Sequence, residues 1–324
     1  MSRKLIRPRT TTPEVETTSG GLYFAAEKDN IQFIRTGCTM LDCVLGGGWP
    51  LGRIVNIVGD KSTGKTLLAM EAIANFFQQY PDGHCWYNEA ESAFDGDYAR
   101  ALGIPFNNVT FIEDCSTVEE LFDSIDGIIK VRDGDKTPCL YIIDSMDALS
   151  DKAELDRGIA EASYGGSKAK QLSSFFRRIS KSIGRTNLCF MIISQVRDNI
   201  GVSFGNKYSR SGGHALDFYA SQILWLAHTG ILKRTVDKVV RPVGVSIKAN
   251  CKKNKVSMPF RQCEFDITFG YGMEDRNASL AWLKELKHPV SVTIGDAELR
   301  KVVIAKWYDI EKSFLPTRTK YDAS

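Results

Sequence analysis

Short, nearly continuous apolar runs recur along the chain from about residue 33, and segments of helical length separate them. The runs lie at residues 54–58, 85–88, 109–112, 139–143 and 188–193. Strands that are buried on both faces and alternate with helices are typical of a mainly parallel sheet. The pattern therefore predicts an α/β core built on such a sheet.

The pattern changes after residue 213, where three apolar runs follow one another with little room for helices between them. They lie at residues 222–227, 243–248 and 263–269 and predict antiparallel strands that extend the same sheet. Residues 279–286 show helical periodicity. We expect an N-terminal arm and oligomerisation segment at 1–32, an α/β core at 33–274 and a small C-terminal region with a tail at 275–324.

Composition narrows the class of protein. Hydrophobic residues make up 43% and charged residues 25% of the 324 positions, which is ordinary globular usage and disfavours disordered, collagen-like and coiled-coil chains. The net charge of +3 is too small to indicate nucleic-acid binding, so any polyanion must meet a local basic patch. Eight cysteines without a CxxC pair indicate thiols in a reducing compartment, and the four scattered histidines give no zinc spacing. With no signal peptide and no long apolar segment, we expect a cytoplasmic protein without a membrane span.

The strongest chemical signal is a phosphate-binding loop. Gly59-Asp-Lys-Ser-Thr-Gly-Lys-Thr66 satisfies G-x-x-x-x-G-K-[ST], follows a β-branched strand and opens a segment of helical periodicity at 65–79. Backbone N–H groups of such a loop hold phosphates, its lysine neutralises the β- and γ-phosphates, and its threonine hydroxyl ligates Mg²⁺. The predicted ligands are Gly59, Asp60, Lys61, Ser62, Thr63, Gly64, Lys65 and Thr66.

Acidic residues at strand ends supply the other polar groups that a nucleotide site needs. Asp144 ends the run at 139–143, which we expect on a neighbouring strand, and would complete the Mg²⁺ shell. Glu89 and Glu91 come just after a strand that we expect to neighbour the strand before the phosphate loop. By position, either glutamate could activate water.

Basic residues gather near two Gly-rich polar segments. Lys170, Ser174, Arg177 and Lys181 share one helical face, opposite Leu172, Phe176, Ile179 and Ile183. A solvated face is the ordinary explanation of such a stripe. However, residues 196–213 form a long loop that carries Arg197, Lys207 and Arg210 among Phe204 and Tyr208, a composition typical of single-strand binding.

These motifs together resemble the RecA family of homologous-recombination ATPases. The matching segments run in order from about residue 33 to about residue 285 and include Glu89-Ala-Glu-Ser-Ala-Phe-Asp95, Ile143-Asp-Ser145, Ser194-Gln-Val-Arg197, Ser211-Gly-Gly-His214 and Lys253-Asn-Lys255. The resemblance implies a filament-forming, DNA-dependent ATPase that uses ATP and Mg²⁺. It also implies pairing and strand exchange between single-stranded DNA and homologous duplex DNA, with single-strand-binding and mediator proteins as partners.

The resemblance also assigns roles to single residues. It makes Glu91 the water-activating carboxylate and Gln195 the γ-phosphate sensor, and it places adenine against Asp95 and Tyr98. Lys253 and Lys255, which would otherwise be taken for a solvated basic turn, would reach the ATP of a neighbouring subunit. Segments 152–167 and 197–213 become DNA loops, with contacts at Lys170, Ser173, Arg177, Arg197, Ile200, Gly201, Phe204, Lys207, Arg210, Gly212 and Gly213.

Departures from the family pattern bear on assembly and on alternative functions. The family's N-terminal helix is reduced to a polar arm in which residues 22–26 would dock on the adjacent subunit, His214 replaces an amide, and the C-terminal region is short without an acidic tail. These differences suggest a bacteriophage-type member acting in a bacterial or phage-infected cell. The alternatives are an accessory DNA-binding ATPase and a ring-forming helicase-type motor on the same core.

Overall fold

The computed structural model describes residues 31–91, 94–152, 166–198, 208–209 and 213–317. Their centre is a nine-stranded sheet in the order β13-β12-β11-β10-β3-β7-β6-β4-β5. Six neighbouring strands are parallel: β3 (Ile54–Gly59), β4 (His84–Glu89), β5 (Val109–Ile112), β6 (Cys139–Asp144), β7 (Leu188–Gln195) and β10 (Gln222–Val236). The antiparallel extension consists of β11 (Val239–Asn254), β12 (Gln262–Thr268) and β13 (Gly272–Met273). The expected fold class is confirmed.

Two expectations about strand order are wrong. The strand that ends at Glu89 does not neighbour the strand before the phosphate loop, because β7 and β6 lie between β3 and β4. The strand that ends at Asp144 is likewise separated from β3 by β7. The acidic strand ends still lie on the loop's side of the sheet, since parallel strands bring all their carboxyl ends to one edge.

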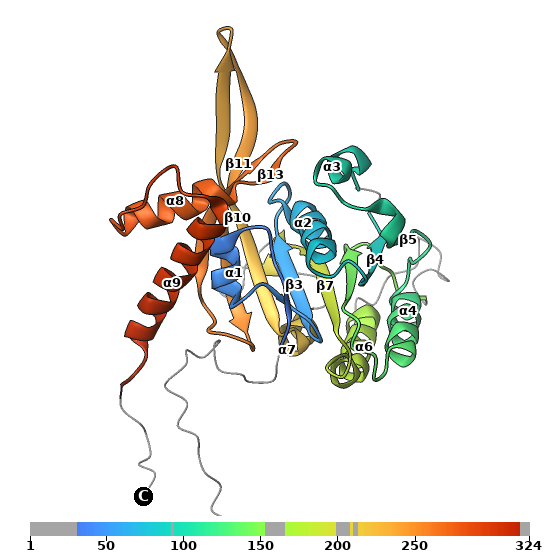
Figure 1. The fold of residues 1–324 in the computed structure, drawn as a ribbon. Coiled ribbons are helices and arrows are strands. Elements are labelled where there is room, and N and C mark those ends of the chain that lie inside the picture. The colour runs from blue at the N-terminus through green and yellow to red at the C-terminus, as the bar shows by residue number, and fades with distance from the viewer. Residues whose placement is uncertain (1–30, 92–93, 153–165, 199–207, 210–212, 318–324) are drawn as a thin grey trace, which may run out of the picture.

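Helices cover both faces of the sheet (Figure 1). Val55 and Ile57 belong to the core formed with α1 (Thr39–Leu45) and α2 (Lys65–Gln79). Ile54 and Val58 point the other way, into the core formed with α4 (Val118–Val131), α6 (Gly166–Ile183) and α7 (Gly213–Tyr219). Consecutive strand residues thus serve opposite faces, which explains the unbroken apolar runs.

The longest sequence-predicted helices have the expected faces. Helix α2 starts at Lys65 and ends at Gln79 as predicted. In α6, Leu172, Phe176, Ile179 and Ile183 are all buried, whereas Lys170, Ser173 and Arg177 are exposed. Shorter elements are β1 (Phe33–Ile34), β2 (Trp49–Pro50), α3 (Gly96–Ala101), η1 (Phe106–Asn108), β8 (Arg197–Asp198) and β9 (Tyr208–Ser209).

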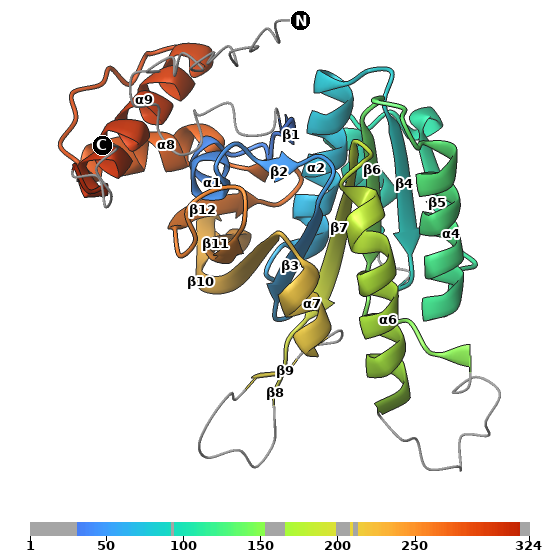
Figure 2. The same cartoon turned by 90° about the horizontal axis from the view of Figure 1, so that it is seen from below.

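The structure contains two features that the sequence analysis did not predict. Strands β10 and β11 continue past the sheet as a projecting hairpin (Figure 1), whose turn residues Asp237 and Lys238 have φ of 49° and 66°. Beyond the short helix α8 (Asp275–Glu285), the chain forms a second C-terminal helix, α9 (Asp296–Phe314). Both helices lie at the end of the molecule away from α4 and β5 (Figure 2).

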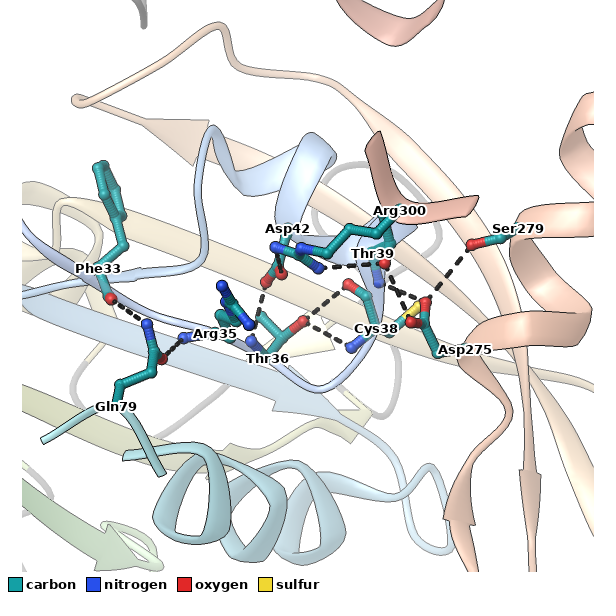
Figure 3. Close-up of polar contacts among 10 residues, drawn as sticks. All are labelled: Phe33, Arg35, Thr36, Cys38, Thr39, Asp42, Gln79, Asp275, Ser279 and Arg300. Carbon is teal, nitrogen blue, oxygen red and sulfur yellow. Dashed lines mark hydrogen bonds and ion pairs between the residues drawn. The ribbon is translucent and has the colours of Figure 1, made fainter. Parts of the chain in front are cut away.

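One ion pair and several hydrogen bonds attach α8 and α9 to α1, as Figure 3 shows. Arg300 lies 2.8 Å from Asp42, whose other oxygen accepts from the Thr36 N–H at 2.8 Å. Asp275 accepts from the N–H of Thr39 at 2.6 Å. Within the described ranges, no helix is long and apolar enough to cross a membrane.

Candidate nucleotide site and nucleic-acid surface

The phosphate loop joins the end of β3 to the start of α2. Ser62 and Gly64 have φ of 58° and 79°, and a Cβ on Gly64 would lie 2.5 Å from Cδ1 of Ile267. The buried Thr63 hydroxyl donates to the carbonyl of Asp60 at 2.8 Å. No side chain caps the first turn of α2. Among the described residues, none accepts from the N–H groups of Lys65 and Thr66, and such free N–H groups at a helix start are the arrangement that binds anions.

Lys65 lies within this loop and is partly buried. Its Nζ donates to the carbonyl of Asp60 at 2.7 Å. Burial lowers the pKa of Lys65, while the nearby carboxylates of Asp144 and Glu91 favour its charged form. A cation is thus held at the mouth of the loop, where phosphate oxygens would replace the carbonyl.

Thr66 and Asp144 form a compact pair of oxygen ligands. The Thr66 hydroxyl donates to Oδ2 of Asp144 at 2.6 Å, and the Tyr87 hydroxyl donates to the same oxygen at 2.9 Å. Asp144 is only 4% exposed, and this burial raises its pKa, while the two hydroxyl donors lower it. Since hydroxyl and carboxylate oxygens suit Mg²⁺, this pair fits the expected metal. The described residues contain no group of three His, Cys, Asp or Glu side chains suited to a metal, so phosphate oxygens and water would supply the other ligands.

The structure gives the two candidate glutamates different surroundings. Glu91 is exposed, and its Oε1 accepts from the Ser145 hydroxyl and, at 2.7 Å, from Nε2 of Gln195. Glu89 instead accepts from the N–H of Phe94 at 2.5 Å. Glu91 is therefore the carboxylate that contacts the end of β7.

Gln195 is the last residue of β7, immediately before the long polar loop. Its N–H donates to Asp147 at 2.8 Å while its side chain holds Glu91. Two residues later, Arg197 lies in β8, which pairs with β9, and Gly213 begins α7. Six other predicted DNA contacts, namely Ile200, Gly201, Phe204, Lys207, Arg210 and Gly212, lie outside the described residues. Three predicted DNA contacts that the structure does describe, Lys170, Ser173 and Arg177, share the exposed face of α6.

The predicted adenine contacts lie at α3. Asp95 caps this helix by accepting from the N–H groups of Asp97 and Tyr98, each at 3.0 Å. Burial and the nearby Glu71 raise the pKa of Tyr98 to about 12. The turn after β12 also reaches Glu71, since a Cβ on Gly272 would lie 2.4 Å from its Oε1.

That turn carries two aromatic rings that sequence reasoning did not single out. Phe269 and Tyr271 are 58% and 64% exposed. The only signal for them was the run Phe269-Gly-Tyr-Gly272, whose two glycines permit a tight turn.

Lys253 and Lys255 lie far from the phosphate loop of their own chain. Lys253 Nζ donates to the carbonyls of Asp217 at 2.5 Å and Phe218 at 2.8 Å, and Lys255 Nζ donates to that of Phe218 at 3.2 Å. Lys253 pairs with Ile223, which lies beside Asn56 of β3. The Lys255 N–H donates to the carbonyl of Ser221, whose own N–H donates to that of Ile54 at the start of β3. The phosphate loop begins at the other end of β3, at Gly59. Because each strand residue adds about 3.3 Å, the two ends of β3 lie roughly 16 Å apart.

Comparison with known proteins decides the family. The family model described as RecA N-terminal domain matches residues 20–274. The chain belongs to the RecA family. It is 38% identical to Protein RecA of Laribacter hongkongensis over 246 residues, which cover 76% of this chain and 66% of the relative. Protein RecA of Cereibacter sphaeroides is 38% identical over 75% of this chain and 68% of the relative, and that of Nostoc sp. 35% identical over 83% and 71%.

The RecA match spans about two thirds of the length of these relatives. The match to the family model, at residues 20–274, includes every nucleotide and DNA position predicted above, from Gly59 to Lys255, and it ends just before α8. The attached helices α8 and α9 therefore lie beyond the part of the chain that the RecA family model describes.

Proposed function

We propose that this RecA-family chain is an ATP-dependent DNA recombinase that forms helical filaments on single-stranded DNA and promotes pairing and strand exchange with homologous duplex DNA. The observation that carries the proposal is the position of Gln195. Its side chain holds Glu91 in the nucleotide site, and its main chain leads directly into the loop expected to bind DNA. A change in the nucleotide site would therefore alter the loop expected to bind DNA, and a change in that loop would alter the nucleotide site.

In this proposal, the phosphate loop and the polar side chains around it form the nucleotide site. Lys65 and the loop N–H groups bind the phosphates of ATP, with adenine against Asp95 and Tyr98. Thr66 and Asp144 would hold Mg²⁺, which when bound neutralises charge on the phosphate oxygens. Glu91 accepts the proton of the attacking water, and Gln195 fixes the orientation of that carboxylate.

The two distant lysines would act on the ATP of a neighbouring subunit. Their position near the start of β3 supports action in trans, because the phosphate loop of the same chain lies at the opposite edge of the sheet. Cations supplied by a neighbour would stabilise charge on the transferred phosphoryl group. The active site is then complete only in a helical homo-oligomer.

The rest of the chain would support assembly. Residues 1–32 serve as arm and oligomerisation segment, 33–274 as the ATPase core and 275–324 as a C-terminal region. Single-strand-binding and mediator proteins would be partners in the cytoplasm of a bacterial or phage-infected cell. The eight cysteines are free thiols and all except Cys43 are buried, which is compatible with a reducing compartment.

The test is ATP turnover with and without single-stranded DNA, combined with electron microscopy of the assemblies. We expect stimulation by DNA, open helical filaments and no turnover in Lys65→Ala. Turnover that ignores DNA, or closed rings in place of filaments, would contradict the proposal.

A further inference from the structure

A groove of about 700 Å³ lies between β12 and α8, and none of the predicted nucleotide-binding residues lines it. Glu264 and Asp266 of β12 line one side, and Ala278, Ala281 and Trp282 of α8 line the other. The small side chains on α8 leave room for a main chain to lie close to the helix. The groove therefore has the shape to receive an extended segment beside the sheet.

The sheet edge in this groove has main-chain groups that point outward. Cys251 donates to the carbonyl of Arg261 and Phe269 to that of Val243, each at 2.9 Å, so the odd-numbered residues of β12 face β11. The alternate residues face away. The carbonyl of Asp266 accepts from Glu274, and β13 pairs only with Ile267 and Thr268.

Two residues of this edge remain open. Among the residues that the structure describes, none donates to or accepts from the outward main-chain groups of Gln262 and Glu264. Such an edge is a template for one further strand.

The charges in the groove indicate which kind of segment could add to this edge as a further strand. Glu264, Asp266 and Glu285 line it, and Lys248, 3.7 Å from Glu264, is the only basic side chain in this lining. A second copy of β12 is disfavoured because it would set carboxylates against carboxylates. A basic segment with an apolar centre complements both the carboxylates and Trp282.

We propose that residues 3–9 of the same chain add a short strand to the open edge of β12. This segment, Arg-Lys-Leu-Ile-Arg-Pro-Arg, has basic residues on both sides of Leu5 and Ile6. When Ile6 faces α8, Lys4 lies on the same face of the added strand as Ile6, near Glu285. Arg7 then lies on the opposite face of that strand, near Glu264 and Asp266. Pro8 lacks an N–H and would end the strand.

The chain is long enough to make this contact within one molecule. The described chain begins at Ile31, and Met40, which lines the groove, follows nine positions later. Those positions span at most about 30 Å, whereas the residues between Arg9 and Ile31 can extend to about 70 Å. Attachment to the same chain also keeps the local concentration of the segment high.

Hydrogen exchange of the outward amides tests the proposal. We expect the Gln262 and Glu264 amides to exchange at least about tenfold more slowly in the full chain than in a chain that lacks residues 2–9. The double variant Glu264→Gln/Asp266→Asn, made in the full chain, should lose most of this protection. The matched variant Glu113→Gln/Asp114→Asn removes two exposed carboxylates after β5 and should keep it.

A labelled peptide of residues 2–9 provides the second measurement. It should bind the shortened chain, and binding should weaken at least about tenfold with Glu264→Pro. That substitution removes an N–H that points away from β11, so thermal unfolding should confirm that the variant folds. Equal exchange in the full and shortened chains would overturn the proposal. Protection that grows with protein concentration would also overturn it, since the segment would then come from a second molecule.

Discussion

At the scale of single residues, the decisive contact is the one between Glu91 and Gln195. Glu89 is the last residue of β4 and Glu91 follows two positions later, so their sequence positions alone did not distinguish them. The choice between the two glutamates depends on which of them lies beside the end of β7. That placement follows from the strand order of the sheet, which is set by packing between segments that are distant in sequence. The phosphate loop needed no such information, because its chemistry is local.

We predict that Glu91→Gln retains nucleotide and DNA binding but loses ATP hydrolysis by at least about a hundredfold, because the amide cannot accept a proton from water. Stable filaments should accumulate. Steady-state turnover and nucleotide binding provide the measurements, with Glu89→Gln as the matched control. A larger loss of turnover in Glu89→Gln would reverse the assignment.

The buried charge of Asp144, a predicted site residue, should lower the free energy of unfolding. Its pKa is raised by burial, so the folded state binds the proton more tightly than the unfolded state does. The free energy of unfolding should therefore fall as pH rises above the ordinary carboxyl pKa of about 3.8.

Asp144→Asn stays neutral and keeps an acceptor for Thr66 and Tyr87. In EDTA and without nucleotide, we expect its Tm at pH 7 to exceed that of the parent by roughly 2 °C or more. The difference should shrink toward pH 4, and scanning calorimetry across this range would check it. A lower Tm at pH 7 would show that the charge stabilises the fold.

At the scale of elements, sequence reasoning located helices and strands with a clear buried face. It missed α9, whose buried positions Leu299, Val303, Trp307 and Glu311 form a narrow stripe that includes a charged residue. It also ended β10 too early and began β11 too late, because both strands of the projecting hairpin are exposed and lack alternation. Burial, which generates the pattern, is absent there.

The exposed face of α6 makes a quantitative prediction. If Arg177 contacts a phosphate, Arg177→Ala should reduce the slope of log affinity for single-stranded DNA against log salt by about 0.7. Lys130→Ala on α4 removes an exposed cation that already pairs with Asp126 and should leave the slope unchanged. Fluorescence titrations at several salt concentrations would measure both, and equal slopes in the two variants would move the contact elsewhere.

The attachment of α9 to α1 depends on a pair that is largely buried. Arg300→Met would leave the carboxylate of Asp42 buried without its cation, and we expect a loss of about 3 kcal/mol in the free energy of unfolding. Lys301→Met breaks an exposed pair with Glu298 and should change it by no more than about 1 kcal/mol. Urea unfolding would measure both variants, and similar losses would contradict this account.

At the scale of the whole molecule, the predicted active site is divided between subunits. Lys65→Ala cannot use its own ATP but still offers Lys253 and Lys255, whereas Lys253→Ala/Lys255→Ala retains its phosphate loop. We predict that mixing these two inactive proteins on DNA restores part of the turnover. Each variant alone is the control, and a mixture that stays inactive in verified mixed filaments would refute action in trans.

The sheet order also has a consequence for the time at which the protein becomes competent during its synthesis. Strand β3 is made early, but its neighbours β7 and β10 come much later, and Asn56 bonds a residue 136 positions further along the chain. At about 5–20 residues per second, this delay lasts roughly 7–27 s on the ribosome. The phosphate loop would thus lack its supporting strands while most of the core is being translated, and nucleotide binding would begin only after β10 has emerged.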